Sequence, residues 1–208
     1  MDFKPMHYIY KPSVNPEART LLLLHGTGGN ETDLLQLADR FGKDINILSL
    51  RGNTDENGMP RFFKRLGMGI FDEKDLEFRT NEMVFFLKDL ALKEKFDITK
   101  IIALGYSNGA NIAGATLLLY PDFLAGAILF RPMMPFKNKK TEVNNRNTPV
   151  FLSSGKEDPT VNSEVIKLYT ILLKNNGFDV TEFILYTSHN LIQQDLDLAV
   201  EWFKKIKI

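Results

Sequence analysis

The sequence of 208 residues contains no cysteine, and this absence removes several classes of protein at once. Without thiols the chain cannot form disulfides, iron–sulfur clusters or thiolate zinc sites, and it cannot use a cysteine nucleophile. The lack of cysteine is consistent with a reducing compartment, because disulfides form and persist in oxidising ones.

Long apolar runs and net charge are also missing. The longest apolar stretches, such as residues 123–130, are far too short to span a bilayer. The first residues contain no apolar segment of the kind that secretory signals carry. The 26 basic residues balance 26 acidic ones, so no overall field attracts nucleic acid or an anionic membrane. We therefore expect a cytoplasmic protein with neither a membrane span nor a nucleic-acid partner.

What is present is ordinary globular composition, with 44% hydrophobic and 25% charged residues. The length fits one domain over residues 1–208. Short apolar segments alternate with segments of helical period, which predicts an α/β fold with a mainly parallel central sheet. Strands are expected at 19–25, 45–50, 100–104, 125–130, 150–153 and 180–186, with a weaker one near 7–10. Helices are expected after Asn30, at 72–95, after Ser107, at 161–175 and at 191–206. Residues 51–71 and 131–147 are predicted to be irregular loops.

The strongest local signal is Gly105-Tyr106-Ser107-Asn108-Gly109, which matches the G-x-S-x-G pattern of a nucleophile elbow. The strand must turn sharply into a helix with the serine at the apex, so glycine is needed on both sides. An apolar strand precedes the motif and a helix rich in small residues follows it, which is the context the motif requires. Ser107 is therefore the predicted nucleophile.

A serine needs a base, and the base needs an orienting acid. Of the three histidines, His189 follows a strand and comes after the serine, which is the order that this type of fold uses. His25 precedes the serine and fits a role in shaping the nearby loop. Asp158 lies just after the strand at 150–153 and is the predicted acid, with Glu157 as its rival and Asp179 less favoured.

Two N–H groups are needed to hold a developing oxyanion. The residue after the nucleophile supplies one, here Asn108, and the loop after an early strand supplies the other, here Thr27. The glycine cluster around Thr27 does not complete a dinucleotide fingerprint, because Glu31 stands where the third glycine is needed. No metal or organic cofactor is expected.

Together these residues resemble the α/β-hydrolase superfamily, and within it the small carboxylesterase/phospholipase group that includes bacterial hydrolases linked to methylhydroquinone resistance. The segments that carry the resemblance are LLLLHGTGGNETDLLQLA, RGNTDENGMPRFFKR, FDEKDLEFRTNE, GYSNGANIA, LFRPMMP and SHNL. It implies Ser107, Asp158 and His189 as a triad, Thr27 and Asn108 as oxyanion donors, and homodimers as a common state. Relatives usually carry glycine before the histidine, where this chain has Ser188.

The resemblance implies a carboxylesterase. The chain length is near the minimum for this fold and leaves no room for a large lid domain, and small esters are favoured over long lipids. In the glycine-rich loop and opposite it, large apolar residues are candidates for an acyl pocket: Met59, Phe62, Phe63, Met68, Phe71, Met133 and Met134. Arg61 and Arg79 either bind a substrate carboxylate or form ion pairs within the loop, and ion pairing is the favoured role.

Three alternatives stay open at this stage. The same triad serves thioesterases and lysophospholipases. Hydrolysis of a cyclic ester, as in dienelactone hydrolases, is disfavoured because that family usually uses cysteine. The last alternative is a non-catalytic ligand-binding protein of the same fold, which typically lacks a triad member.

Overall fold

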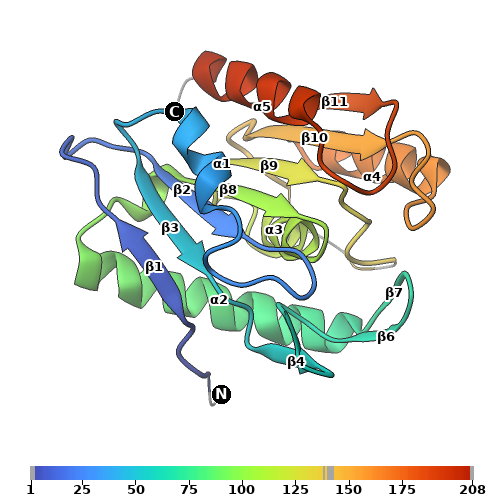
Figure 1. Ribbon diagram of the computed structural model, residues 1–208, viewed down its shortest axis with the longest axis horizontal. Coiled ribbons are helices and arrows are strands. Elements are labelled where there is room, and N and C mark those ends of the chain that lie inside the picture. Colours follow the sequence, from blue (N-terminus) through green and yellow to red (C-terminus); the bar gives the residue numbers. More distant parts are fainter. Residues whose placement is uncertain (1–2, 138, 140–142, 207–208) are drawn as a thin grey trace.

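The computed structural model describes residues 3–137, 139 and 143–206, and its centre is a seven-stranded sheet (Figure 1). The strand order is β1-β3-β2-β8-β9-β10-β11; β1 runs antiparallel to β3, and all other pairs are parallel. The strands are β1 (Tyr8–Lys11), β2 (Thr20–Leu24), β3 (Asn46–Leu50), β8 (Ile101–Tyr106), β9 (Gly126–Phe130), β10 (Pro149–Gly155) and β11 (Asp179–Leu185). Each lies within two residues of its predicted position.

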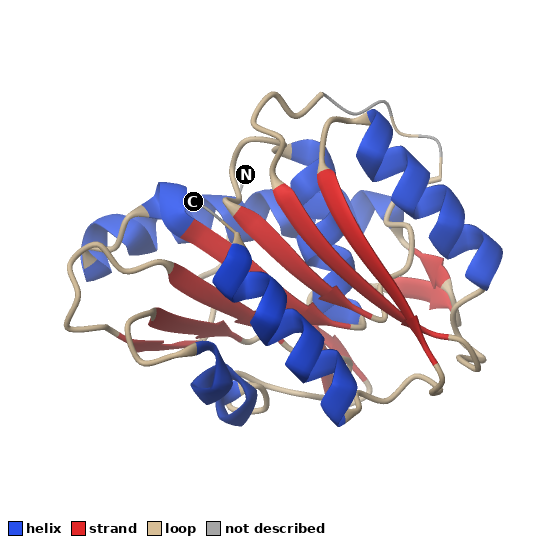
Figure 2. Ribbon diagram, turned by 90° about the horizontal axis from the view of Figure 1, so that it is seen from above, coloured by secondary structure: helices blue, strands red, loops and turns tan. Residues whose placement is uncertain are grey.

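Helices cover both faces of this sheet (Figure 2). On one face, α2 (Glu73–Glu94), α3 (Asn108–Leu119) and α4 (Ser163–Asn175) share a hydrophobic core with the sheet. On the other face, α1 (Leu35–Ala38) and α5 (Gln193–Lys205) build a second core around Trp202 and Phe203. Central strand β2 is buried at every position, as expected for a parallel strand between two helical layers.

The segment after β3 is more ordered than the sequence analysis predicted. Residues 51–71 form two hairpins, β4 (Thr54–Glu56) with β5 (Met59–Arg61), and β6 (Arg65–Gly67) with β7 (Ile70–Phe71). The first turn is Asn57-Gly58, with φ angles of 55° and 81°. Asn-Gly is a strong signal for a two-residue hairpin, because both positions need a positive φ. The expectation of an irregular loop was wrong, because the Asn57-Gly58 turn closes a hairpin.

The helix predicted after Asn30 is also different. Only one turn of α1 and a short 3-10 turn, η1 (Asp39–Phe41), form there. Asn30 does not cap a helix; its Oδ1 accepts hydrogen bonds from the N–H and hydroxyl of Thr32. The side chain therefore closes a local turn in competition with the helix, a common behaviour of asparagine.

The predicted loop at 131–147 contains no helix or strand in the part that the structure describes, while residues 138 and 140–142 lie outside it. Within the described residues, none of the helices has both the length and the apolar character needed to cross a membrane.

Candidate active site

Ser107 stands at a sharp turn between β8 and α3. Its backbone has a φ of 52° and a ψ of −110°, an unfavourable conformation for a residue with a side chain. A Cβ added to Gly109 would lie 1.9 Å from the carbonyl oxygen of Leu24, and one added to Gly105 would lie 2.5 Å from the nitrogen of Ala110. Both glycines are therefore required by close backbone contact, and the strained turn lifts the serine side chain away from the sheet.

Three residues that are far apart in the sequence meet at this turn. The hydroxyl of Ser107 lies 2.9 Å from Nε2 of His189, and Nδ1 of His189 lies 2.7 Å from Oδ2 of Asp158. The Asp158 side chain is 1% exposed, whereas His189 is 30% exposed toward the cavity. Such a chain can move a proton from the serine to the imidazole while the carboxylate holds the ring.

Thr160 adds a second partner to both members of the Asp158–His189 pair. Its N–H and its hydroxyl both donate to Oδ1 of Asp158, at 2.8 and 2.7 Å. The hydroxyl oxygen also lies 2.9 Å from Nδ1 of His189. Burial by itself would raise the pKa of Asp158, but the hydrogen bonds from Thr160 and His189 outweigh burial and hold this pKa below its usual value. The carboxylate is therefore ionised at neutral pH.

A buried ion pair fixes the loop that carries His189. Arg131 is fully buried after β9, with a φ of 53°, and its guanidinium forms two bonds to the carboxylate of Asp195 at 2.8 and 2.6 Å. It also donates to the carbonyl oxygens of Ser188 and Asn190, at 3.3 and 2.9 Å. These two carbonyls flank His189, so one arginine holds the backbone on both sides of the imidazole. Ser188, at which the resemblance marks a departure from the family pattern, takes part in this arrangement through its backbone carbonyl.

Asp195 is held from three directions. Besides Arg131, the hydroxyl of Ser153 on β10 donates to it. The N–H of Ile192 also donates to it, at 2.9 Å, which caps the first turn of α5. The last helix, two central strands and the histidine loop are thus joined through one carboxylate.

The loop after β2 lies on the opposite side of Ser107. Burial lowers the pKa of His25, so its ring is neutral; Nδ1–H donates to the carbonyl of Gly26, and Nε2 accepts from the N–H of Gly52. The side-chain oxygen of Asn108 accepts from the N–H of Phe62 at 2.7 Å. The N–H of Asn108 belongs to the first turn of α3, where helical N–H groups have no partner within the helix. The loop carrying Thr27 and the start of α3 therefore flank the serine.

These elements enclose a cavity of about 250 Å³. Its lining is Thr27, Arg61, Arg65, Met68, Gly69, Phe71, Tyr106, Ser107, Asn108, Asn111, Arg131, Met133, Thr160 and His189. Among the predicted acyl-pocket residues, Met68, Phe71 and Met133 face this space. The β6–β7 hairpin lies at the end of the molecule where β8, β9 and β10 finish (Figure 1).

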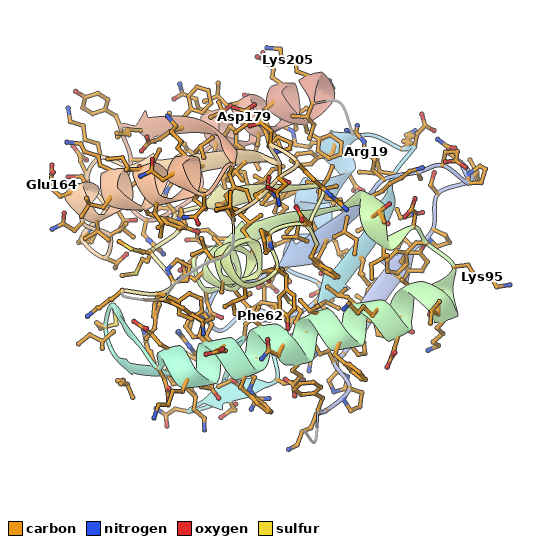
Figure 3. All side chains as sticks on the ribbon, turned by 180° about the vertical axis from the view of Figure 1, so that it is seen from behind. Arg19, Phe62, Lys95, Glu164, Asp179 and Lys205 are labelled. Atoms are coloured by element: carbon orange, nitrogen blue, oxygen red, sulfur yellow. The ribbon has the colours of Figure 1, made fainter. Side chains whose placement is uncertain are left out.

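Four other predicted pocket residues do not line the cavity. Phe62 and Phe63 are 1% and 0% exposed and belong to the core between the sheet and α2 (Phe62 is labelled in Figure 3). Met134 packs against the same core, and Met59 is partly exposed on β5. Phe62 packs against the ring of His25, at a centroid distance of 4.7 Å.

The two candidate arginines differ in position. Arg79 on α2 pairs with Glu82 at 2.8 Å and with Asp75 at 3.6 Å and does not line the cavity, so ion pairing describes it. Arg61 is 3% exposed and does line it; the guanidinium donates to Oγ1 of Thr27 at 2.5 Å and to the carbonyl of Phe63 at 3.1 Å.

Residues 7–207 match the family described as Phospholipase/Carboxylesterase. The chain belongs to this family. It is 42% identical over 200 residues to "Putative hydrolase MhqD" of Bacillus subtilis (strain 168), covering 96% of this chain and 98% of that protein. The Bacillus cereus carboxylesterase structure is 43% identical, with a TM-score of 0.93 over 96% of this chain and 94% of that one. Acyl-protein thioesterase 1 of Candida albicans is 32% identical over 132 residues, which cover 58% of this chain and 57% of that protein.

These matches confirm the resemblance and the α/β-hydrolase fold that the sequence predicted, with a mainly parallel sheet and no large lid domain in the described residues. They also confirm that this phospholipase/carboxylesterase family member is a hydrolase of the carboxylesterase class.

The structure also separates the candidate acids of this family member. Glu157 is exposed, and its N–H donates to the carbonyl of Thr187. Asp179 (labelled in Figure 3) is the first residue of β11, at the end of the strand away from His189. Of the three candidates, Asp158 is the one that contacts His189.

Sequence reasoning missed the partners that hold the site. Thr160 follows Asp158 in an Asp-x-Thr pattern, which signals a side-chain-closed turn. Asp195 stands on the buried face of α5, four residues before Ala199, and a charged residue at such a position signals a buried partner. Tyr106, whose hydroxyl donates to the carbonyl of His189 at 3.2 Å, was visible only as an unassigned position of the elbow.

Proposed function

We propose that this protein is a serine carboxylesterase that cleaves small carboxylic esters through an acyl-enzyme intermediate, with Ser107, His189 and Asp158 as its triad. The observation that carries the proposal is the continuous chain of short contacts from the Ser107 hydroxyl through the imidazole to a buried carboxylate. The strained backbone of Ser107 supports it, because such strain is retained where a side chain must be presented to a ligand.

In the first step, the Ser107 oxygen attacks the ester carbonyl while its proton passes to Nε2 of His189. The carbonyl π bond opens, and the oxygen becomes an oxyanion. When the tetrahedral intermediate collapses, the bond to the alcohol oxygen breaks and His189 returns the proton to that oxygen. The alcohol leaves, and the acyl group remains as an ester of Ser107.

In the second step, water takes the place of the alcohol. His189 removes a proton from the water, and the water oxygen attacks the acyl carbon. When this intermediate collapses, the bond between the acyl carbon and the Ser107 oxygen breaks, His189 returns the proton to that oxygen, and the carboxylic acid leaves. The carboxylate of Asp158 keeps Nδ1–H pointed toward itself and stabilises the imidazolium in both steps.

The backbone N–H groups of Thr27 and Asn108 are the proposed oxyanion donors. Both residues line the cavity next to Ser107, and the Asn108 N–H lies at the positive end of α3. The hydrogen bond from Phe62 to the Asn108 side chain and the one from Arg61 to the Thr27 side chain fix the two residues. A preorganised donor of this kind contributes about 3–4 kcal/mol to the lowering of the barrier.

The cavity size favours short substrates. About 250 Å³ is at the small end of ligand sites and accommodates an ester with a short acyl group and a small alcohol. Met68, Phe71 and Met133 supply the apolar part of the wall.

A thioesterase is the second candidate function, and the acyl-protein thioesterase among the relatives favours considering it. The same triad and oxyanion donors serve a thioester, because its carbonyl passes through the same tetrahedral intermediate. The two functions are separated by comparing an oxygen ester and a thioester with the same acyl group.

The proposal is tested on the purified full chain with p-nitrophenyl esters of increasing acyl length, the matching thioesters and a fluorophosphonate probe. We expect turnover of acetate and butyrate esters, a decline at long chains, and phosphonylation of Ser107 identified by peptide mass. Absence of both turnover and labelling would contradict the proposal. A thioester rate well above the oxygen-ester rate would favour the second candidate.

Thr160→Val is expected to lower kcat while leaving KM nearly unchanged, because it removes the hydroxyl that holds Asp158 and His189 without changing the cavity walls greatly. The chain offers a matched control in Asp97 and Thr99, where the threonine N–H and hydroxyl also donate to the aspartate, at 2.9 and 2.6 Å. Thr99→Val removes the same bond far from the cavity and should leave kcat unchanged. Equal kcat values for the two variants would show that Thr160 has no positioning role.

The two threonine variants should share one pH effect on stability. Thr160 and Thr99 help to hold the pKa values of Asp158 and Asp97 below the usual 3.8. A carboxyl whose pKa is lower in the folded state stabilises the fold above its unfolded pKa, and this stabilisation is lost as the pH falls through the folded pKa. The stability gap between wild type and each variant, measured by urea unfolding, should therefore be wider at about pH 7 than at about pH 2.

A further inference from the structure

The cavity wall contains cations that the triad does not use. Its lining includes Arg61, Arg65 and Arg131 and no aspartate or glutamate among the described residues. Arg131 is fully neutralised by its two bonds to Asp195. Arg61 and Arg65, in contrast, share one acidic partner within the described part of the chain, Glu56. Asp158 lies behind His189, with its side chain 1% exposed.

Glu56 satisfies only one of its two arginines. Its Oε1 accepts from Nε of Arg65 at 2.8 Å, a bond that holds the pKa of Glu56 below its usual range and keeps it ionised. Its Oε2 lies 3.5 Å from Nη1 of Arg61 but is buried without a hydrogen-bond partner. Two positive charges therefore face one negative charge, so the part of the cavity wall formed by Arg61 and Arg65 is positive.

The remaining donors of Arg65 have a weak partner. Its Nη1 lies 3.1 Å from the sulfur of Met68, and a thioether is a poor hydrogen-bond acceptor. A carboxylate oxygen would replace this contact with a charge-assisted hydrogen bond, which is about twice as strong as a neutral one. Met68 is 69% exposed, so its flexible side chain can move aside.

We propose that the Arg61–Arg65 wall binds a carboxylate group of the substrate, so that the preferred esters are half-esters of short dicarboxylic acids. The inference rests on the proposed esterase function and specifies its substrate class. The cavity of about 250 Å³ fits such a substrate. With the ester carbonyl at Ser107, the short chain lies against Phe71 and Met133, and the free carboxylate lies at the Arg61–Arg65 wall.

The test compares two esters of equal shape on the full chain: monoethyl succinate, which carries a carboxylate, and ethyl levulinate, in which a methyl group replaces the charged oxygen. Hydrolysis is followed by acid release, and the readout is the ratio of their kcat/KM values. Arg65→Gln removes one charge from the wall, and Arg65→Lys keeps the charge without the planar fork. Arg40→Gln is the control, because Arg40 pairs with Asp197 outside the cavity and its loss is the same charge change.

We expect the wild type to prefer the succinate half-ester, and Arg65→Gln to reduce the kcat/KM ratio about tenfold, the factor that one charge-assisted bond supplies. Arg65→Lys should retain part of the preference, and Arg40→Gln should leave the ratio unchanged. A wild type without preference for the anionic ester, or an equal ratio in Arg65→Gln, would overturn the proposal.

Failure of the esterase function gives a different result, in which neither ester is hydrolysed by the wild type. In that case calorimetric titration with free succinate decides whether the Arg61–Arg65 wall binds a carboxylate. Binding to the wild type that weakens in Arg65→Gln and not in Arg40→Gln supports the carboxylate site, and absence of binding to the wild type overturns it.

Discussion

Replacing Ser107 by alanine is expected to lower kcat for p-nitrophenyl acetate by about 10⁴- to 10⁶-fold, the range found when single members of a triad are removed. The hydroxyl of Ser107 contacts His189, so the substitution removes the attacking atom and leaves the surrounding packing in place. The residual rate would come from the oxyanion donors and from substrate binding. Steady-state kinetics on matched preparations measure the effect.

Two controls make the Ser107→Ala result specific. The variant should keep the unfolding midpoint of the wild type within a small margin, because alanine adopts the same strained backbone. Ser13→Ala, outside the cavity, should retain the wild-type rate. A Ser107→Ala protein that hydrolyses the ester as fast as the wild type would end the proposal of a serine nucleophile.

The largest effect on stability is expected for Asp195→Ala. This change leaves the Arg131 guanidinium buried without its counter-charge, since both side chains are 0% exposed. Breaking one partner of a buried ion pair lowers the free energy of unfolding by about 3–5 kcal/mol. The helix cap on Ile192 and the hydrogen bond from Ser153 are lost as well. Urea unfolding at neutral pH measures the difference.

The control for Asp195 lies two residues further along α5. Asp197 pairs with Arg40 at 2.6 Å, but their side chains are 54% and 37% exposed. Removal of an exposed ion pair changes stability by at most about 1 kcal/mol. Asp197→Ala should therefore unfold close to the wild type. The double variant Arg131→Met, Asp195→Leu should recover much of the stability lost in Asp195→Ala, because it removes the stranded charge. Similar losses for Asp195→Ala and Asp197→Ala would contradict this account of the buried pair.

The parts of the fold that the sequence predicted are those with a local cause. Apolar runs of strand length predicted all seven strands of the sheet. The elbow was predicted from Gly105-Tyr106-Ser107-Asn108-Gly109, because contacts within a few residues or with the adjacent strand require its two glycines. Chain order alone placed His189 and Asp158 at the same edge of the sheet, since the carboxyl ends of parallel strands meet there.

The parts that the sequence did not predict depend on contacts between distant segments. Arg131 and Asp195 are 64 positions apart, and no spacing rule connects the end of β9 with the first turn of α5. Phe62 and Phe63 carry the same apolar signal as Phe71, yet the first two are buried and the third lines the cavity. Composition identifies such residues as large and apolar; the direction of the hairpin decides which of them meet solvent or ligand.

The ion pair and hydrogen bonds of Arg131 have a consequence for the order in which this protein becomes active during synthesis. Ser107 and the strands beside it precede His189 and α5 in the chain, so β2, β8 and β9 can pair before the histidine loop is synthesised. The loop that carries His189 is fixed only once α5 has brought Asp195 to Arg131, which follows β9. On the proposed triad, a nascent chain presents Ser107 before His189 is held beside it, and we expect hydrolysis only after α5 has docked.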